Sequence, residues 1–278
     1  MPISRRQFVI ASTFTAGFAL AVQPIANSAI QTSSNNLVSG SISIPSSTGA
    51  IPAYYAAPAK GEGFPVVLVI QEIFGVHEHI RDVVRRFARL GYVAIAPELF
   101  ARQGDVSKLK DIDEIRKIVA KVPDPQVLTD IDASLNWVVQ NAKGNIDRVA
   151  ITGFCWGGRI TWLYAAHNPK IKAGVAWYGK LTGEKNALNP QQPIDVAASL
   201  TVPVLGLYGG QDTGIPLDSV EQTRQQLQKG KSGSSIIVYP DAPHAFFADY
   251  RPNYRQKDAQ DGWKRLQSWF KAKGVIAI

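Results

Sequence analysis

Residues 149–158 read Val-Ala-Ile-Thr-Gly-Phe-Cys-Trp-Gly-Gly, a short apolar run that leads into a cysteine flanked by glycines. Gly153 and Gly157 lie two residues before and two residues after Cys155. This spacing is typical of a sharp strand-to-helix turn, where a nucleophile takes a strained backbone and the flanking chain packs too closely for side chains. The stretch therefore predicts a strand over Val149–Phe154, a turn at Cys155 and a helix after it.

The predicted turn would give Cys155 the surroundings of a nucleophile. It aims the sulfur at a helix N-terminus, where the helix dipole and the free N–H groups favour a thiolate. The backbone N–H of Trp156 would then form one half of an oxyanion hole. The alternative is a small buried cysteine in a glycine-containing turn, which is the usual role of a lone cysteine without such a context. The strand, the two glycines and the helix together favour the nucleophile.

Further apolar runs along the chain have the continuous character of strands covered by helices on both faces. They are Val66–Ile70, Tyr92–Ala96, Ala173–Tyr178, Val204–Tyr208 and Ile236–Tyr239. Segments with helical spacing alternate with them: Ile80–Leu90 (followed by a stop at Gly91), Gln126–Asn141, Arg159–Ala166, Asp218–Gln228 and Lys257–Lys273. Ser41–Ile44 and Ala53–Ala57 predict an antiparallel hairpin at one edge. The pattern predicts the α/β class, with a mostly parallel, doubly covered sheet in a single domain over residues 30–278.

An acid and a histidine each follow a later predicted strand, Asp212 in Gly-Gly-Gln-Asp and His244 in Pro-Asp-Ala-Pro-His. Functional residues of parallel sheets lie just past the carboxyl ends of strands. A nucleophile, an acid and a histidine in this chain order are the pattern of the α/β-hydrolase fold. His244 would accept and return protons, while Asp212 would fix its tautomer. The competing acids are Asp218, which could cap the next helix, and Asp241, three residues before His244.

The loop after Val66–Ile70 reads Gln-Glu-Ile-Phe-Gly-Val and is expected to supply the second oxyanion donor, the N–H of Ile73. Glu72 beside it is unexpected, because a carboxylate there repels the developing negative charge. It is either buried and paired with an arginine, or it contacts the thiol in the resting enzyme and moves when substrate binds. His77 and His79 follow, but no third ligand stands out, so a metal site is weakly supported.

These residues resemble the dienelactone hydrolases, or carboxymethylenebutenolidases, a family of α/β-hydrolases. The resemblance covers nearly all of the chain from about residue 37 and rests on the motifs QEIFG at 71–75, LFARQ at 99–103, GFCWGG at 153–158, Asp212, and HAF at 244–246. It implies a Cys155–His244–Asp212 triad, a thioester at Cys155 that water hydrolyses, and a role for Glu72 in activating the thiol. It also implies that no metal or organic cofactor is needed.

One departure from the family concerns the substrate. The founding enzymes are understood to bind the substrate carboxylate with two arginines, and Arg102 matches the first. The second position, four residues after His244, is Ala248, and the nearest arginine is Arg251. A bidentate arginine clamp strongly determines the choice of an anionic substrate. The family chemistry is therefore expected, whereas a dienelactone substrate is not implied.

Aromatic side chains are expected to line an apolar pocket for a small-molecule ester or lactone, although core packing is the alternative for some of them. We expect the substrate to be bound by Arg102, Tyr178 and Phe246. Because one fold hosts many reactions, a broad esterase, a thioesterase or a peptidase remains an alternative function. A different class is a non-catalytic binding or thiol redox-sensing protein that retains the turn at Cys155.

The first residues predict export. Arg5 and Arg6 precede a mildly apolar run over Phe8–Val22, and small residues follow near Ser28 and Ala29. This is the pattern of an export signal over residues 1–29, and the paired arginines favour the twin-arginine route. The alternatives are an ordinary signal or an uncleaved anchor. The run is too short and polar to span a bilayer stably, so we expect an extracytoplasmic, periplasmic protein without a membrane span in its mature form.

The remaining bulk properties exclude some classes of protein. The 278 residues carry a net charge of +8 and one cysteine, so no internal disulfide holds the fold. Basic residues group mildly at Arg81, Arg85, Arg86 and Arg89, a spacing typical of a solvated helix face. No basic run interleaved with aromatic residues occurs, so nucleic-acid binding is not expected. We expect a monomer.

Overall fold

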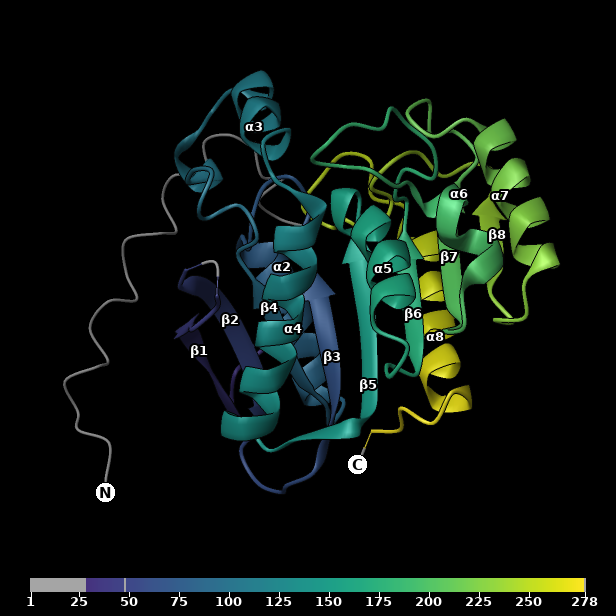
Figure 1. Cartoon of the computed structure of the whole chain (residues 1–278). Helices are drawn as coiled ribbons and strands as arrows, with labels where there is room; N and C mark the ends of the chain where they lie inside the picture. The colour runs from purple at the N-terminus through teal and green to yellow at the C-terminus, as the bar shows by residue number, and fades with distance from the viewer. Residues whose placement is uncertain (1–28, 48, 278) are drawn as a thin grey trace.

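An eight-stranded sheet runs through the computed structural model, which describes residues 29–47 and 49–277 (Figure 1). The strand order is β1-β2-β4-β3-β5-β6-β7-β8. The first two strands form an antiparallel hairpin at one edge, β2 is also antiparallel to β4, and the other neighbours are parallel. The strands are β1 (Leu37–Ile44), β2 (Ile51–Pro58), β3 (Phe64–Ile70), β4 (Val93–Pro97), β5 (Gly144–Phe154), β6 (Ala173–Trp177), β7 (Val204–Gly209) and β8 (Ser235–Tyr239). The predicted α/β-hydrolase fold with its mostly parallel sheet is confirmed.

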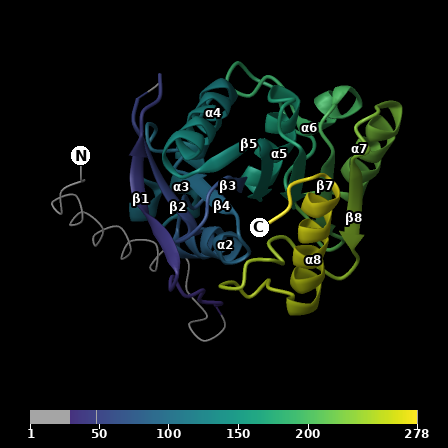
Figure 2. The same cartoon turned by 90° about the horizontal axis from the view of Figure 1, so that it is seen from below.

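Helices cover both faces of the sheet (Figures 1 and 2). One face carries α2 (Glu78–Arg89) and α8 (Gln256–Ala272). The other carries α4 (Asp124–Asn141) and α5 (Trp156–His167), with α6 (Pro193–Val196) and α7 (Leu217–Lys229) beyond them. The connections also contain α3 (Ile112–Val119) and the 3-10 turns η2 (Val106–Lys108) and η3 (Ala197–Ser199).

Burial follows the position of a strand in the sheet. All seven residues of β3 are buried, because helices lie over both of its faces. The edge strand β1 instead alternates between exposed and less exposed positions. Gly91 comes just after α2 with φ +96°, a conformation that a glycine adopts without steric cost, as the sequence predicted for this helix end. The continuous apolar runs therefore mark the central strands.

Several elements differ from the sequence predictions. Strand β5 begins at Gly144 rather than at Val149, because its polar first residues already pair with the start of β3 across a register shift. The short helices α3 and α6 and the two 3-10 turns were not predicted. Helix α6 has only four residues, too few for a helical period to show in the sequence.

The basic face of α2 is less solvated than the sequence predicted. Arg85 and Arg86 are largely shielded from solvent: each side chain is 12% exposed, and each guanidinium pairs with Asp82 on the same helix. Arg86 also pairs with Asp249, which comes from the loop before α8. The helical spacing of the arginines was correct, but a buried acid from a distant segment turns this face into a packing surface.

The predicted export signal lies outside the described residues, apart from its last position. Within the described ranges, no helix combines the length and the apolar character that crossing a membrane requires.

Candidate active site

Cys155 occupies a strained turn between β5 and α5. Its backbone has φ 55° and ψ −115°, and its N–H donates to the carbonyl oxygen of Trp177 at 3.0 Å. A Cβ on Gly153 would lie 2.2 Å from the carbonyl oxygen of Gly157, and one on Gly157 would lie 2.5 Å from that of Ile70. The glycines are therefore required by the close approach of main chain to main chain, and the predicted nucleophile turn is present.

His244 joins the acid and the cysteine. Its Nδ1 lies 2.6 Å from Oδ2 of Asp212, and the imidazole also interacts with the side chain of Cys155. Burial lowers the pKa of His244, but the bonds to Asp212 and Cys155 outweigh it and raise that pKa to about 10. His244 is therefore predominantly protonated at neutral pH. The three side chains form a continuous Cys–His–Asp chain.

The competing acids lie elsewhere. Asp218 is exposed in the first turn of α7, and Asp241 is exposed in the turn after β8. Asp212 is 6% exposed, and its Oδ1 accepts the N–H of Gly214 at 2.9 Å, which fixes the carboxylate. The structure thus brings Asp212 to the histidine.

The two predicted oxyanion donors lie on neighbouring segments. Trp156 is the first residue of α5, where a backbone N–H has no intrahelical acceptor. Ile73 lies in a tight turn closed by the bridge between Glu72 and Gly75. A Cβ on Gly157 would also lie 2.5 Å from the carbonyl oxygen of Gln71, so this turn begins directly against the first turn of α5.

Glu72 differs from both sequence expectations. It is 1% exposed, and its Oε2 accepts the Tyr250 hydroxyl at 2.6 Å and lies 3.3 Å from Nε2 of His77. Neither an arginine nor the Cys155 thiol is hydrogen-bonded to it among the described residues. Burial raises the pKa of Glu72, but His77 and Tyr250 lower it to about 2, so the carboxylate stays ionised. Tyr250 lies far from residue 72 in sequence, which is why its role could not be foreseen.

The two histidines of this loop belong to a buried polar network. Burial lowers the pKa of His77 to about 4, so it is neutral at pH 7 and acts as a donor to Glu72. His79 stacks on His77 at 5.9 Å, and its Nδ1 lies 3.1 Å from Oδ1 of Asp249. Among the described residues, no group of three or more His, Cys, Asp or Glu side chains could hold a metal ion. Each of these two histidines therefore interacts with a carboxylate, His77 with Glu72 and His79 with Asp249.

The predicted substrate-binding residues do not form one group. The guanidinium of Arg102 pairs with the fully buried Asp130 of α4. Phe246 is fully buried, and its ring packs at 5.9 Å from Trp177, so it belongs to the core. Tyr178 is also fully buried, but its ring contacts the imidazole of His244 edge-on at 5.1 Å. Only Tyr178 of these three touches a triad residue.

From the sequence, Arg251 is only the arginine nearest to Ala248, the position at which the family pattern has its second arginine. Its guanidinium lies over the Phe74 ring at 5.3 Å, in the loop that carries Glu72. It also acts electrostatically on Tyr178, Tyr250 and His77. Arg251 is therefore the arginine that the structure places beside the predicted site, whereas Ala248 is buried.

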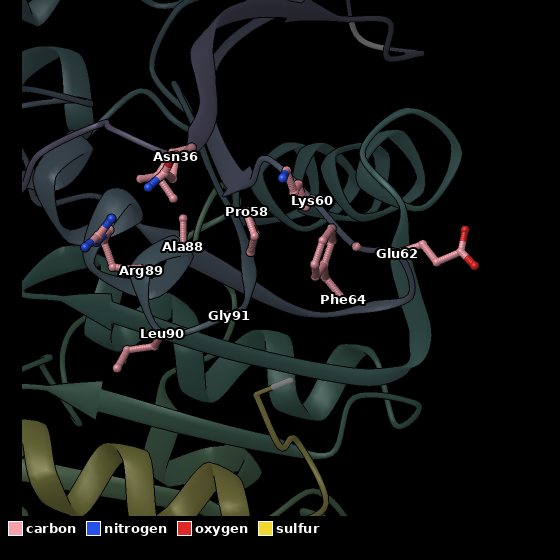
Figure 3. A pocket seen from close by; sticks show the side chains of 11 residues that line it. Asn36, Pro58, Lys60, Glu62, Phe64, Ala88, Arg89, Leu90 and Gly91 are labelled. Atoms are coloured by element: carbon pink, nitrogen blue, oxygen red, sulfur yellow. The ribbon is translucent and has the colours of Figure 1, made fainter.

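Two surface hollows lie away from the triad. One, of about 320 Å³, is lined by residues at the start of β1 and β3 and the ends of β2 and α2, including Phe64 and Leu90 (Figure 3). The other, of about 480 Å³, lies over Tyr54 and Arg85. In parallel sheets the ligand site lies past the carboxyl ends of the strands, which is where Cys155, Asp212 and His244 meet. We therefore place the site at the triad.

A second buried acid supports the loop of Glu72. Glu98 follows β4, and its Oε2 accepts the N–H of Val76 at 2.7 Å. Burial of this carboxylate raises its pKa to about 7. Because the buried Glu98 carboxylate resists ionisation, its hydrogen bond to the loop of Glu72 depends on pH.

Comparisons with known proteins point to one family. The model of the dienelactone hydrolase family matches residues 51–274. Proteins described as "Putative carboxymethylenebutenolidase" from Methylorubrum extorquens and Escherichia coli (strain K12) are 57% and 55% identical, covering 97% and 95% of this chain and 94% and 98% of their own. The crystal structure of a "Putative Dienelactone Hydrolase" from Klebsiella pneumoniae superposes with a TM-score of 0.82 at 54% identity, covering 84% of this chain and 98% of that one.

Changing Asp212 to Asn should lower ester hydrolysis roughly 100-fold or more, because an amide cannot hold the imidazole in the required tautomer and charge state. The same change at the exposed Asp241 is the matched control and should leave kcat/KM nearly unchanged. Steady-state kinetics of both variants make the comparison. A larger loss at Asp241 would transfer the role of the acid to that residue.

Changing Glu98 to Gln should stabilise the fold at pH 8 but not at pH 4. The pKa of Glu98 is about 7 in the folded protein and near 4.5 when unfolded, so the folded state loses stability as the pH rises from 4.5 to 7. That loss amounts to up to about 3 kcal/mol, and glutamine avoids it while still accepting the Val76 N–H. Thermal unfolding across pH measures the effect, with the exposed Glu62→Gln as control; an equal gain at both pH values would contradict the assignment.

Proposed function

The chain belongs to the dienelactone hydrolase family, and we propose that it hydrolyses an ester or lactone with Cys155 as the nucleophile. The observation that carries this proposal is the 2.6 Å contact of His244 with Asp212, together with the interaction of the same imidazole with Cys155 on its strained turn. A nucleophile, a base and an orienting acid in mutual contact are the arrangement that acyl transfer requires.

In acylation His244 takes the proton of the Cys155 thiol. The sulfur attacks the carbonyl carbon, and the negative charge that develops on the carbonyl oxygen is stabilised by the N–H groups of Trp156 and Ile73. His244 then gives its proton to the leaving oxygen as the carbon–oxygen bond breaks. The acyl group stays on Cys155 as a thioester. In a lactone the leaving oxygen remains tethered to the acyl chain.

Deacylation uses water. Its oxygen attacks the thioester carbon while His244 takes one of its protons, and the carbon–sulfur bond then breaks to release the carboxylic acid product. Cys155 and His244 thereby return to their starting state. Asp212 steadies the imidazolium in both half-reactions.

The names of the relatives support a lactone as the substrate, since a carboxymethylenebutenolide is an unsaturated lactone bearing a carboxylate. The arginines argue for weaker selection of that carboxylate. Arg102 is neutralised by Asp130, and the guanidinium beside the site is that of Arg251. We propose a lactone or ester hydrolase that holds an anionic group through Arg251 alone. Export of the mature protein is proposed on the sequence of its first residues.

Replacing Cys155 with Ala should abolish turnover of lactones and aryl esters. A thiol redox sensor would instead show oxidation of Cys155 but no acyl adduct. Intact-mass measurement after rapid mixing of the unaltered protein with p-nitrophenyl butyrate should reveal the butyryl thioester, absent in Cys155→Ala. Unchanged turnover by this variant would end the proposal.

Arg251→Ala should reduce the preference for anionic over neutral esters about tenfold, since one charge-assisted hydrogen bond is lost. Arg102→Ala is the comparison and should change this ratio little, because its guanidinium is held by Asp130. The ratio of kcat/KM for a carboxylate-bearing and a neutral aryl ester measures the effect. The reverse ranking would return the substrate contact to Arg102.

A further inference from the structure

The hydroxyl of Tyr178 is buried and has no hydrogen-bond partner among the described residues. Other buried tyrosines of the fold are bonded: Tyr164 donates to Asp132 at 2.9 Å, and the Tyr208 hydroxyl accepts from Trp162 at 3.1 Å. An unpaired buried hydroxyl destabilises the folded state, so a phenylalanine would serve packing better at this position. The hydroxyl therefore calls for a function.

The main chain fixes Tyr178 beside the nucleophile. Its N–H donates to Leu207 at 2.8 Å, and the preceding residue, Trp177, accepts the N–H of Cys155 at 3.0 Å. A Cβ on Gly179 would lie 2.3 Å from the carbonyl carbon of Gly158 in α5. Tyr178 itself has φ 37°, a conformation that costs a non-glycine residue energy and is concentrated at functional sites. Strain is accepted here to hold this side chain against the triad.

The Tyr178 hydroxyl keeps its proton and can therefore always donate a hydrogen bond. Burial first, and then the negative charges of Glu72 and Cys155, raise the pKa of its phenol well above the usual value. The ring edge against His244 completes the contact with the triad.

Glu72 supplies a matching acceptor. Its Oε2 receives the Tyr250 hydroxyl, whereas its Oε1 is buried without a hydrogen-bond partner among the described residues. The carboxylate is ionised at neutral pH, so Oε1 is an acceptor with no donor. Glu72 follows β3 and Tyr178 follows β6, the two strands that flank β5, and β5 ends next to Cys155. One unpaired acceptor and one unpaired donor thus belong to residues on either side of Cys155.

We propose that Tyr178 and Oε1 of Glu72 form a subsite for one small hydroxylic molecule, the water that hydrolyses the thioester. A molecule satisfying both atoms must accept one hydrogen bond and donate another. An anion would be repelled by Glu72, and an apolar group would leave both atoms unpaired. Water meets both demands and makes such bridges at little entropic cost.

This inference rests on the proposed thioester at Cys155. The water accepts the Tyr178 O–H and donates one O–H to Glu72, while its second proton passes to His244 as the oxygen bonds to the acyl carbon. The carbon–sulfur bond then breaks, and the electron pair stays on the sulfur of Cys155. Glu72 keeps its charge throughout and orients the water. The subsite therefore acts in deacylation and not in acylation.

The test separates the two half-reactions of Tyr178→Phe with p-nitrophenyl butyrate in stopped flow. The burst of p-nitrophenolate, which reports acylation, should change less than about threefold, whereas deacylation should slow at least about tenfold. The butyryl enzyme should then accumulate in intact-mass spectra. Tyr164→Phe removes a buried hydroxyl away from the triad and should alter neither phase.

An equal slowing of both phases, or no slowing of deacylation, would overturn the subsite while leaving the acyl-enzyme intact. If the unaltered protein never acquired a butyryl group on Cys155, the proposed function itself would fail, and this outcome is distinct from the first.

Glu72→Gln provides the second arm. It should also slow deacylation, and because both residues would hold the same water, the double variant should deacylate no slower than the slower single variant. Multiplying effects would overturn a shared molecule. Should Tyr178→Phe fail to fold by thermal unfolding, Glu72→Gln carries the test: a loss confined to deacylation supports the subsite, and a loss confined to acylation overturns it.

Discussion

Main-chain atoms from three strands meet at Cys155 at distances that leave no room for side chains. The first turn of α5 packs against the end of β3 through Gly157 and against the end of β6 through Gly158, where a Cβ would lie 2.4 Å from the carbonyl oxygen of Trp177. This packing forces the backbone of Cys155 to φ 55° and leaves its sulfur at the carboxyl edge of the sheet. The oxyanion turn and Tyr178 then sit beside the sulfur because they continue those same two strands. The positions of Cys155, of the two proposed oxyanion donors and of Tyr178 follow from this close approach.

The loop after His244 is held by charge rather than by apolar packing alone. Asp249 pairs with Arg86 and His79, and Tyr250 donates to Glu72, so the segment is tied to α2 and to the oxyanion loop at once. Buried ion pairs contribute little net stability, because desolvation offsets much of their attraction. Their value here is positional: they allow one arrangement of the histidine loop against the loop that stabilises the oxyanion.

The sequence identifies the three residues of the candidate triad better than the residues that surround them. Cys155, Asp212 and His244 are recognisable because each follows an apolar strand within a short, distinctive motif, and strand order alone brings such residues to one edge. Tyr250 and Asp249 carry no such signal, since their roles depend on partners more than 160 positions away in sequence. Arg102 shows the same limit: its motif predicts a substrate contact, whereas its pairing with Asp130 on α4 becomes visible only in the structure. Local patterns specify strands and turns, whereas buried polar pairing is settled only by the packed fold.

The charge balance of the site explains how a carboxylate can sit beside an oxyanion hole. Glu72 and Ile73 are neighbours in one tight turn, and the Glu72 side chain is directed into the donors of Tyr250 and His77. Its charge is thus stabilised by fixed hydrogen bonds that would otherwise be made by water, and it needs no arginine. Arg251, over Phe74 in the same loop, adds positive potential without forming an ion pair with Glu72. The turn can therefore present an N–H to a developing oxyanion while its carboxylate remains ionised, because the donors that hold Glu72 also limit the field it exerts on the reacting carbonyl.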